Sequence, residues 1–159
     1  MSWPPESLKS NTEDIINECE LMEVMPSRGG GKQFIPVVEL AAFLYTGEYV
    51  HARHVWQRWK ENNPPVLLQD WWRVGAAMME SDPDTIWKGL EHIQSHHPAP
   101  LNAYAAEVGT AYRIRILQRF WGSTAPAAPA ATRPPYLALL NVSSPAELEG
   151  FCNEHCIGG

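Results

Sequence analysis

The feature that most constrains the fold of this chain is an internal repeat with a period of 34 residues, the separation of positions 52 and 86. Shifting the sequence by that distance brings similar positions together: Ala52 on Ile86, Trp56 on Leu90, Trp59 on Ile93 and Pro64 on Pro98. The apolar members recur every three or four residues, as on one face of an α-helix. The closing prolines end the helices, because the residue before a proline avoids helical geometry. The repeat therefore predicts two helical pairs with the same layout.

This period is typical of tetratricopeptide repeats, whose units are pairs of antiparallel helices. Residues 47–56 follow the pattern G-x-Y-x-x-A-x-x-x-W and resemble the second helix of such a unit. Ser81 in the place of Gly47, and Trp59 where a small residue is usual, depart from it. A helical pair cannot bury its apolar face alone, so we expect the pairs to stack with tryptophans between the helices. The histidines and basic side chains of the stretch would then be its solvated side.

Further helices are expected on both sides of the two pairs, because the same apolar spacing continues there. The expected helices cover residues 10–25, 36–46, 49–63, 66–80, 82–95 and 101–121, with two short helices within 136–157. Residues 122–135 are rich in alanine and proline and nearly uncharged, which favours an exposed linker. The sequence thus predicts an all-α chain with a helical-repeat domain at 10–121, a linker at 122–135 and a helix-turn-helix pair at 136–159.

Composition and charge exclude several classes of protein. The chain has 159 residues, 45% of them hydrophobic, and a net charge of −6. This acidity opposes sequence-independent nucleic-acid binding, which requires many basic side chains to neutralise phosphates. No apolar run approaches the roughly 18 residues that a membrane-spanning helix requires. Three cysteines without a framework spacing favour reduced thiols and a nuclear or cytosolic location.

Several side chains could in principle bind a metal. These candidates are histidines and cysteines at close spacing: His51 and His54; His92, His96 and His97; and Cys152, His155 and Cys156. Catalytic zinc sites of the H-E-x-x-H type add a glutamate base and a third ligand, which neither histidine pair has. The cysteines lack an upstream cysteine pair. We therefore expect exposed histidines near helix ends, and no metal, cofactor or catalytic residue.

Three arginines on the expected helix 101–121 raise the question of RNA binding. Arg113, Arg115 and Arg119 could form a basic stripe, but the acidity of the chain favours a solvated helix face instead.

Motifs of nucleotide binding and of nucleophilic catalysis are also missing from the sequence. Gly29–Lys32 lacks the spacing of a P-loop, and no G-x-S-x-G motif occurs. The sequence therefore indicates no enzymatic activity.

Three stretches point to one known family. Residues 17–20 read Asn-Glu-Cys-Glu, and residues 52–58 resemble a family segment of the form A-R-x-x-W-x-R. Residues 72–87 resemble a longer family run, which begins W-x-V-G and continues here through Asp82 to Ile86 and Trp87. Together they resemble the PCI family, which includes subunits of the COP9 signalosome, of the proteasome lid and of translation initiation factor 3. The resemblance covers roughly residues 12–157 and is strongest over 40–95.

This resemblance implies a PCI module, in which a right-handed superhelix of tetratricopeptide-like hairpins is capped by a winged helix. Residues 136–159 would form a partial winged helix, because no wing strands follow the second short helix. It also implies a non-catalytic scaffold of a multi-subunit complex, foremost the COP9 signalosome of nucleus and cytoplasm. That complex removes the modifier Nedd8 from cullin-RING ubiquitin ligases through a different subunit.

Two alternatives remain open beside the signalosome. Subunits of the proteasome lid or of initiation factor 3 share the same architecture. A nucleic-acid-binding helix-turn-helix protein is a different class, which would need positive charge on its second short helix. Residues 144–156 instead read SPAELEGFCNEHC, with acidic side chains.

Contact with partner subunits is expected at the apolar residues of the C-terminal helical pair. So short a pair cannot bury all of them internally. The candidates are Tyr136, Leu139, Leu140, Leu148 and Phe151. The alternative for each of them is packing back on the helix at 101–121.

Overall fold

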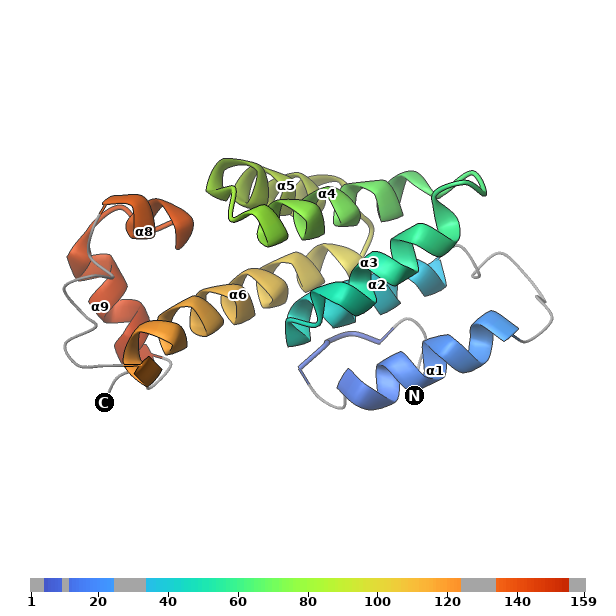
Figure 1. Ribbon diagram of the computed structural model, residues 1–159, viewed down its shortest axis with the longest axis horizontal. Helices are drawn as coiled ribbons and strands as arrows, with labels where there is room; N and C mark the ends of the chain where they lie inside the picture. The colour runs from blue at the N-terminus through green and yellow to red at the C-terminus, as the bar shows by residue number, and fades with distance from the viewer. Residues whose placement is uncertain (1–4, 10–11, 25–33, 124–133, 155–159) are drawn as a thin grey trace.

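The computed structural model describes residues 5–9, 12–24, 34–123 and 134–154, and no β-strand occurs in these ranges. The prediction of an all-α fold is therefore confirmed. The helices, shown in Figure 1, are α1 (Thr12–Val24), α2 (Ile35–Thr46), α3 (Tyr49–Trp59), α4 (Val66–Glu80), α5 (Pro83–His96), α6 (Leu101–Ser123), α8 (Pro134–Leu139) and α9 (Pro145–Glu154). Most of the linker expected at 122–135 lies outside the described residues.

Helix α2 is the centre of the hydrophobic core. Its sequence, IPVVELAAFLYT, is apolar on every side, and each residue from Ile35 to Leu44 is buried. A helix that is apolar all round must be covered all round. Helices α1, α3, α4 and α6 pack against α2 and provide that cover.

The two predicted helical pairs, α2–α3 and α4–α5, have matching turns. In the first turn, Gly47 N–H donates to the Leu44 carbonyl and Glu48 N–H to the Phe43 carbonyl, over 3.3 and 2.9 Å. Thirty-four residues later the same bonds recur from Ser81 to Met78 and from Asp82 to Ala77, over 3.3 and 3.0 Å. Both pairs of bonds are those that close a helix on a left-handed residue. The sequence repeat therefore corresponds to a repeat of backbone geometry.

Capping side chains fix where α5 and α9 begin. The Asp82 carboxylate accepts bonds from Thr85 Oγ1 at 2.7 Å and from Thr85 N–H at 3.4 Å, and Pro83 follows in the first turn. At α9, Glu147 N–H donates to Ser144 Oγ at 3.3 Å. The Glu147 carboxylate accepts from Ser143 N–H at 2.7 Å. These bonds satisfy amides that a helix start leaves without partners.

Helix α3 is shorter than expected from the sequence, which predicted helix as far as residue 63. It ends at Trp59, and Asn63 has a left-handed backbone with φ of 52°. The Asn62 side-chain amide donates to the Arg58 carbonyl at 3.2 Å and so satisfies one carbonyl of the last turn. Asparagine competes in this way with continuation of a helix.

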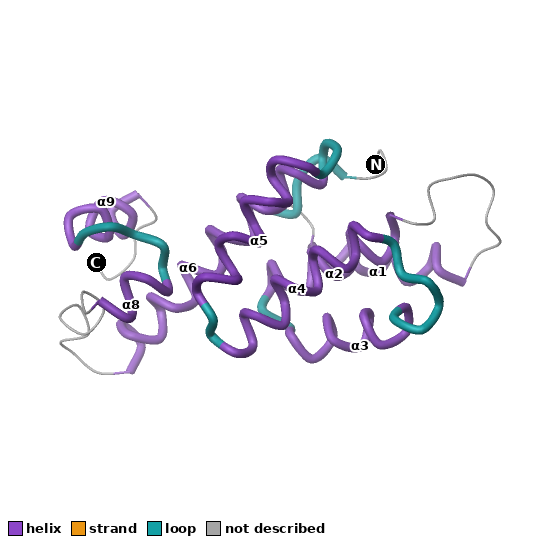
Figure 2. Tube along the Cα trace, turned by 90° about the horizontal axis from the view of Figure 1, so that it is seen from above, coloured by secondary structure: helices purple, strands orange, loops and turns teal. Residues whose placement is uncertain are grey.

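Helix α6 links the ends of the molecule. Figures 1 and 2 both show α1, α2 and α3 toward one end of the molecule, and α8 and α9 beside the C-terminal part of α6 toward the other end. The segment 5–9, which precedes the expected domain boundary at residue 10, also packs on α6. Leu8 is fully buried, its N–H donates to Glu107 Oε2 at 2.7 Å, and Tyr104 donates from its hydroxyl to the Pro5 carbonyl.

The matching turns lead to a first prediction. Replacing Ser81 by glycine should raise the free energy of unfolding by about 1 kcal/mol, because Ser81 has a φ of 55° that glycine adopts without steric cost. Urea denaturation of the variant and the wild type measures this difference.

The matched control is Gly47→Ser at the equivalent turn. It should lower stability, because Gly47 has a φ of 82° and a Cβ there would lie 2.9 Å from the Arg115 side chain. A Ser81→Gly variant less stable than the wild type would show that Ser81 is not strained.

Candidate functional site

The predicted partner-binding residues lie where the α8–α9 pair meets α5 and α6. Leu140 and Leu148 are buried within the chain, as in the alternative of internal packing. Leu139 and Phe151 are half-buried and pack at the edge of the core. The side chain of Tyr136 lies outside the described residues. Partner binding by these residues stays a prediction, with Leu139 and Phe151 the ones that retain exposed surface.

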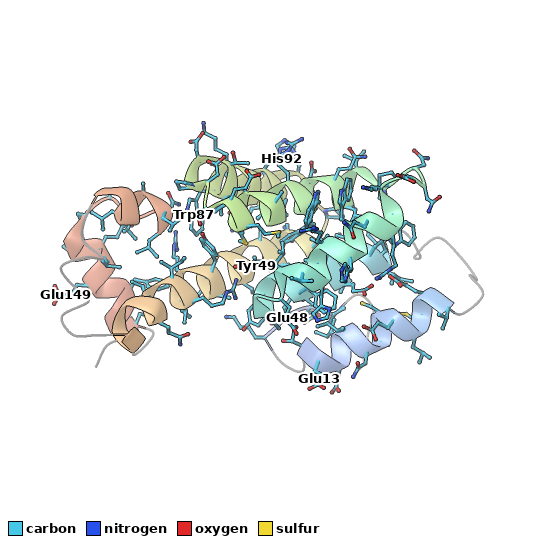
Figure 3. All side chains as sticks on the ribbon, viewed as in Figure 1. Glu13, Glu48, Tyr49, Trp87, His92 and Glu149 are labelled. Atoms are coloured by element: carbon cyan, nitrogen blue, oxygen red, sulfur yellow. The ribbon has the colours of Figure 1, made fainter. Side chains whose placement is uncertain are left out.

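Two side chains of the repeat helices hold this junction through backbone carbonyls. Trp87 Nε1 on α5 donates to the Leu139 carbonyl at 2.8 Å. Arg113 Nε on α6 donates to the Leu140 carbonyl at 2.7 Å. Both carbonyls lie at the C-terminal end of α8, where a helix leaves its carbonyls without partners. Figure 3 shows Trp87 on the side of α5 that faces α8.

The Arg113 guanidinium lies between two aromatic rings. Its Cζ is 4.6 Å from the centre of the Trp87 ring and 5.7 Å from that of Phe151. Such contacts attract the cation to the ring faces and fix its orientation. Burial lowers the pKa of Arg113, and the nearby carboxylate of Glu147 acts against this shift.

A groove of about 860 Å³ opens beside this arginine. Its walls come from α5, from α6 and from the turn between α8 and α9. The lining includes Asp84, Lys88 and Glu91 on α5, Ala105, Ala106 and Arg113 on α6, and Val142 in the turn. The groove is thus part charged and part apolar.

Arg115 lies on the opposite side of α6 and binds the end of α2. Its Nη1 donates to the Tyr45 carbonyl at 2.6 Å, and its Nη2 donates to the Leu44 carbonyl at 2.9 Å and to the Tyr49 hydroxyl at 3.1 Å. A cation at this place also meets the negative end of the α2 dipole. The guanidinium passes so close to Gly47 that no side chain fits there.

The expectation that the arginines of α6 form a solvated face is therefore wrong for Arg113 and Arg115. Positions two apart on a helix point in nearly opposite directions, so these residues cannot share one stripe. Both are partly buried and donate to backbone carbonyls. The side chain of Arg119 lies outside the described residues.

The histidines depart from the expectation at one position. His51, His54, His92 and His96 are exposed as expected, and Figure 3 shows His92 on the outer edge. His97 is buried, which corrects the prediction of an exposed residue. Its Nε2 lies 3.0 Å from Asp70 Oδ2 on α4, a partner that sequence spacing did not indicate.

In the described ranges, no group of three or more His, Cys, Asp or Glu side chains is placed to hold a metal ion. His155 and Cys156 lie outside those ranges, as does the side chain of Cys152.

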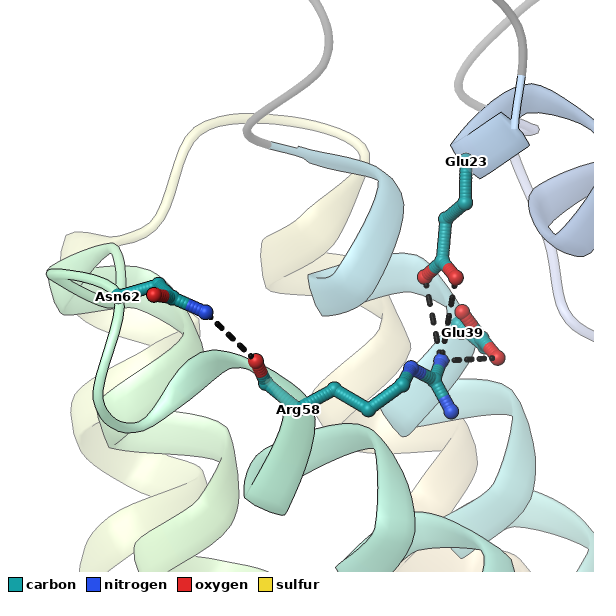
Figure 4. Close-up of polar contacts among 4 residues, drawn as sticks. All are labelled: Glu23, Glu39, Arg58 and Asn62. Atoms are coloured by element: carbon teal, nitrogen blue, oxygen red, sulfur yellow. Dashed lines mark hydrogen bonds and ion pairs between the residues drawn. The ribbon is translucent and has the colours of Figure 1, made fainter.

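A charged cluster joins α1, α2 and α3 (Figure 4). Arg58 Nη2 lies 3.1 Å from Glu39 Oε1 and 3.2 Å from Glu23 Oε2. Glu39 is buried in the middle of α2, where burial and the carboxylate of Glu23 raise its pKa to about 8 against the pull of Arg58. Sequence analysis did not select Glu39, although a lone acidic residue in the apolar run IPVVELAAFLYT was a signal for it. Glu39 is buried, and Arg58 and Glu23 cover it from α3 and α1, so the cluster fits a structural role.

Cys19, from the stretch 17–20, is buried beside this cluster. Burial raises the pKa of its thiol, and the surrounding glutamates, Glu39 first among them, raise it further. Because the thiolate is the reactive form, this cysteine is held as an unreactive thiol.

No protein-family model, curated protein or solved structure matches this chain significantly. No helix in the described part of the chain has both the length and the apolar character to cross a membrane.

The raised pKa of Glu39 predicts a loss of stability as pH rises. Between the ordinary value of 4.5 and about 8, the folded chain keeps a proton that the unfolded chain releases. Folding then becomes less favourable by on the order of 1 kcal/mol for each pH unit. Glu39→Gln cannot ionise, so urea denaturation at pH 5 and pH 8 should show a smaller fall for this variant than for the wild type. Glu91→Gln, at an exposed position, should keep the wild-type fall, and equal falls in all three proteins would contradict the assignment.

Removing the cap at the end of α2 should destabilise the fold. Arg115→Gln should lower the free energy of unfolding by about 2–3 kcal/mol, because hydrogen bonds from a charged donor are lost and buried carbonyls remain without partners. Thermal and urea denaturation measure the change. The exposed Arg73→Gln on α4 is the control and should change stability by less than about 0.5 kcal/mol. Equal effects of the two substitutions would mean that Arg115 does not support α2.

Proposed function

We propose that this chain is a non-catalytic scaffold subunit of the COP9 signalosome, similar to its subunit 8. It would support the complex that removes Nedd8 from cullin-RING ubiquitin ligases, in the nucleus and the cytoplasm. The observation that carries the proposal is the order of parts along the chain. Two helical pairs with matching turns precede a long helix, and a short helical pair is bound at the end of that helix. This is the order of parts in a PCI module, to which the motifs in 40–95 are also similar.

In this proposal, α2 to α6 belong to a right-handed superhelix of tetratricopeptide-like hairpins. Helices α8 and α9 would be the helix-turn-helix of a partial winged helix, joined to α6 through Trp87 and Arg113. A rigid junction of this kind suits a scaffold, because it fixes one binding surface relative to another. The tight internal bonding of Glu39, Arg58 and Arg115 also supports a structural role for the polar groups.

The alternative complexes, the proteasome lid and initiation factor 3, share this architecture and are separated from the signalosome by the experiment below. Nucleic-acid binding is less well supported. Helix α9, which would have to enter a groove of DNA, carries the exposed residues Glu147, Glu149 and Glu154. Acidic side chains on a recognition helix would repel the phosphates.

Affinity purification from cells tests the proposal. The tagged full-length chain should recover subunits of the COP9 signalosome at moderate salt, as identified by mass spectrometry. Leu139→Glu should reduce this recovery, because Leu139 is a predicted contact with exposed surface and holds α8 through its carbonyl rather than its side chain. Val66→Glu, at an exposed apolar position on α4, is the matched control and should leave recovery unchanged.

Three outcomes would overturn parts of the proposal. Recovery of proteasome-lid or initiation-factor subunits would change the complex and keep the architecture. Equal recovery with Leu139→Glu and Val66→Glu would remove the α8–α9 pair as the contact surface. Recovery of none of these subunits by any of the three proteins would refute the assignment to a PCI complex.

A further inference from the structure

Arg113 carries a charge that the chain itself does not neutralise. One of its N–H groups is used by the Leu140 carbonyl. Across the residues that the structure describes, its terminal amino groups have no hydrogen-bond partner, and no carboxylate lies within ion-pair distance. A partly desolvated charge gains from a nearby opposite charge. By comparison, Arg58 binds two carboxylates through Nη2, and Arg115 binds backbone carbonyls through both Nη1 and Nη2.

The closest acidic group is already engaged elsewhere. Glu147 is the carboxylate that acts on the charge of Arg113. Its Oε2 accepts the Ser143 N–H at 2.7 Å, as part of the cap of α9. Moving it to Arg113 would remove that cap. The counter-ion of Arg113 is therefore best supplied from outside the chain.

The surroundings of Arg113 fix the direction from which such a group can arrive. The Trp87 and Phe151 rings hold the guanidinium, and the Leu140 carbonyl binds its Nε edge. Arg113 also lines the groove of about 860 Å³ between α5, α6 and the α8–α9 turn. A guanidinium held in this way offers two parallel N–H donors, which match the two oxygens of a carboxylate.

We propose that this groove is a docking site for a segment of a partner polypeptide that carries one aspartate or glutamate, whose side chain pairs with Arg113. The apolar lining at Ala105, Ala106 and Val142 would accept the residues next to that carboxylate. A single carboxylate fits the charges of the site better than a nucleic acid does. Asp84 and Glu91 in the groove, and the net charge of −6, would repel a polyanion. The inference goes beyond the scaffold role, because it does not depend on which complex the chain joins.

Binding can be followed at the junction itself by nuclear magnetic resonance. The Trp87 indole N–H, assigned with a Trp87→Phe variant, lies beside Arg113 and reports on the groove. The full-length ¹⁵N-labelled chain is titrated with the capped peptide acetyl-Ala-Leu-Glu-Leu-Ala-amide. The same peptide with glutamine in place of glutamate, and one with phosphoserine there, are titrated in parallel. The glutamate peptide should shift this resonance with saturation, and the glutamine peptide should bind at least about tenfold more weakly.

Paired substitutions on α6 separate charge pairing from simple occupation of the groove. Thr110 lies three positions before Arg113 and so on the same side of the helix. Thr110→Glu would supply the missing carboxylate from within the chain, which should raise the melting temperature and abolish binding of the glutamate peptide. Thr110→Gln introduces a side chain of nearly the same size as Thr110→Glu but without the charge. It should neither raise the melting temperature nor abolish binding of the glutamate peptide. Arg113→Lys keeps the charge but loses the paired donors, and should weaken binding about tenfold.

Several results would overturn the inference. Equal affinity for the glutamate and glutamine peptides would show that no carboxylate is recognised. Preference for phosphoserine over glutamate would assign the site to a phosphate group instead. Absence of binding by all three peptides at millimolar concentration, or equal binding by Thr110→Glu and Thr110→Gln, would exclude the groove as an acidic-peptide site. In each case a Trp87 indole resonance that stays dispersed in the peptide-free protein, as in the peptide-free wild type, would show that the junction is intact.

Discussion

The arrangement of this chain depends on two arginines that extend from opposite sides of one helix to the ends of two others. Arg115 binds the last carbonyls of α2, and Arg113 binds a carbonyl at the end of α8. Helix ends carry carbonyls without internal partners and the negative end of the helix dipole, so a guanidinium meets both needs at once. Helix α6 thereby connects the central core helix to the C-terminal pair. The arginines are two positions apart, which places the two attachments on different faces of α6.

The core and its charged cluster follow from the same requirement that buried polar groups find partners. Helix α2 is covered on all sides, and it still carries Glu39 in its middle. Arg58 from α3 binds Glu39 and Glu23 together and so joins three helices at one point. The cluster specifies how α1 is placed on the α2–α3 pair, because each acidic residue comes from a different helix. Apolar packing alone would leave that placement less well defined.

Local signals made much of the fold predictable. Helical spacing of apolar residues, the prolines and caps at Asp82 and Ser144, and the 34-residue period located the helices within a few residues. Ser81 takes the place of Gly47 in the second copy of the repeat. The backbone at Ser81 nevertheless has the same left-handed geometry as at Gly47. Helix α3 ended early because the turn at Asn62 competes with the helix, and such competition depends on surroundings that the sequence pattern does not include.

The site was predicted less well, for a physical reason. The partners of Arg113 and Arg115 are backbone carbonyls 27 to 71 positions away, and a carbonyl has the same chemistry in every residue. No residue type near the partner therefore indicates the bond. His97 and Asp70 present the same difficulty, since they are 27 positions apart, one on α4 and the other directly after α5. Of the five residues chosen from apolar character, Leu140 and Leu148 are enclosed by the chain, and partner binding by the others stays a prediction.

The attachment of α8 through its carbonyls has a consequence for how the chain can diverge. Trp87 and Arg113 bind main-chain oxygens at residues 139 and 140, so these bonds place no requirement on the side chain at residue 139. Drift of the sequence on the outer side of this short helix would leave the joint intact. The same frame could thus present different surfaces in related proteins, with the donors on α5 and α6 retained. A search for relatives should accordingly weigh an indole and a guanidinium 26 positions apart more heavily than any residue of the helix they hold.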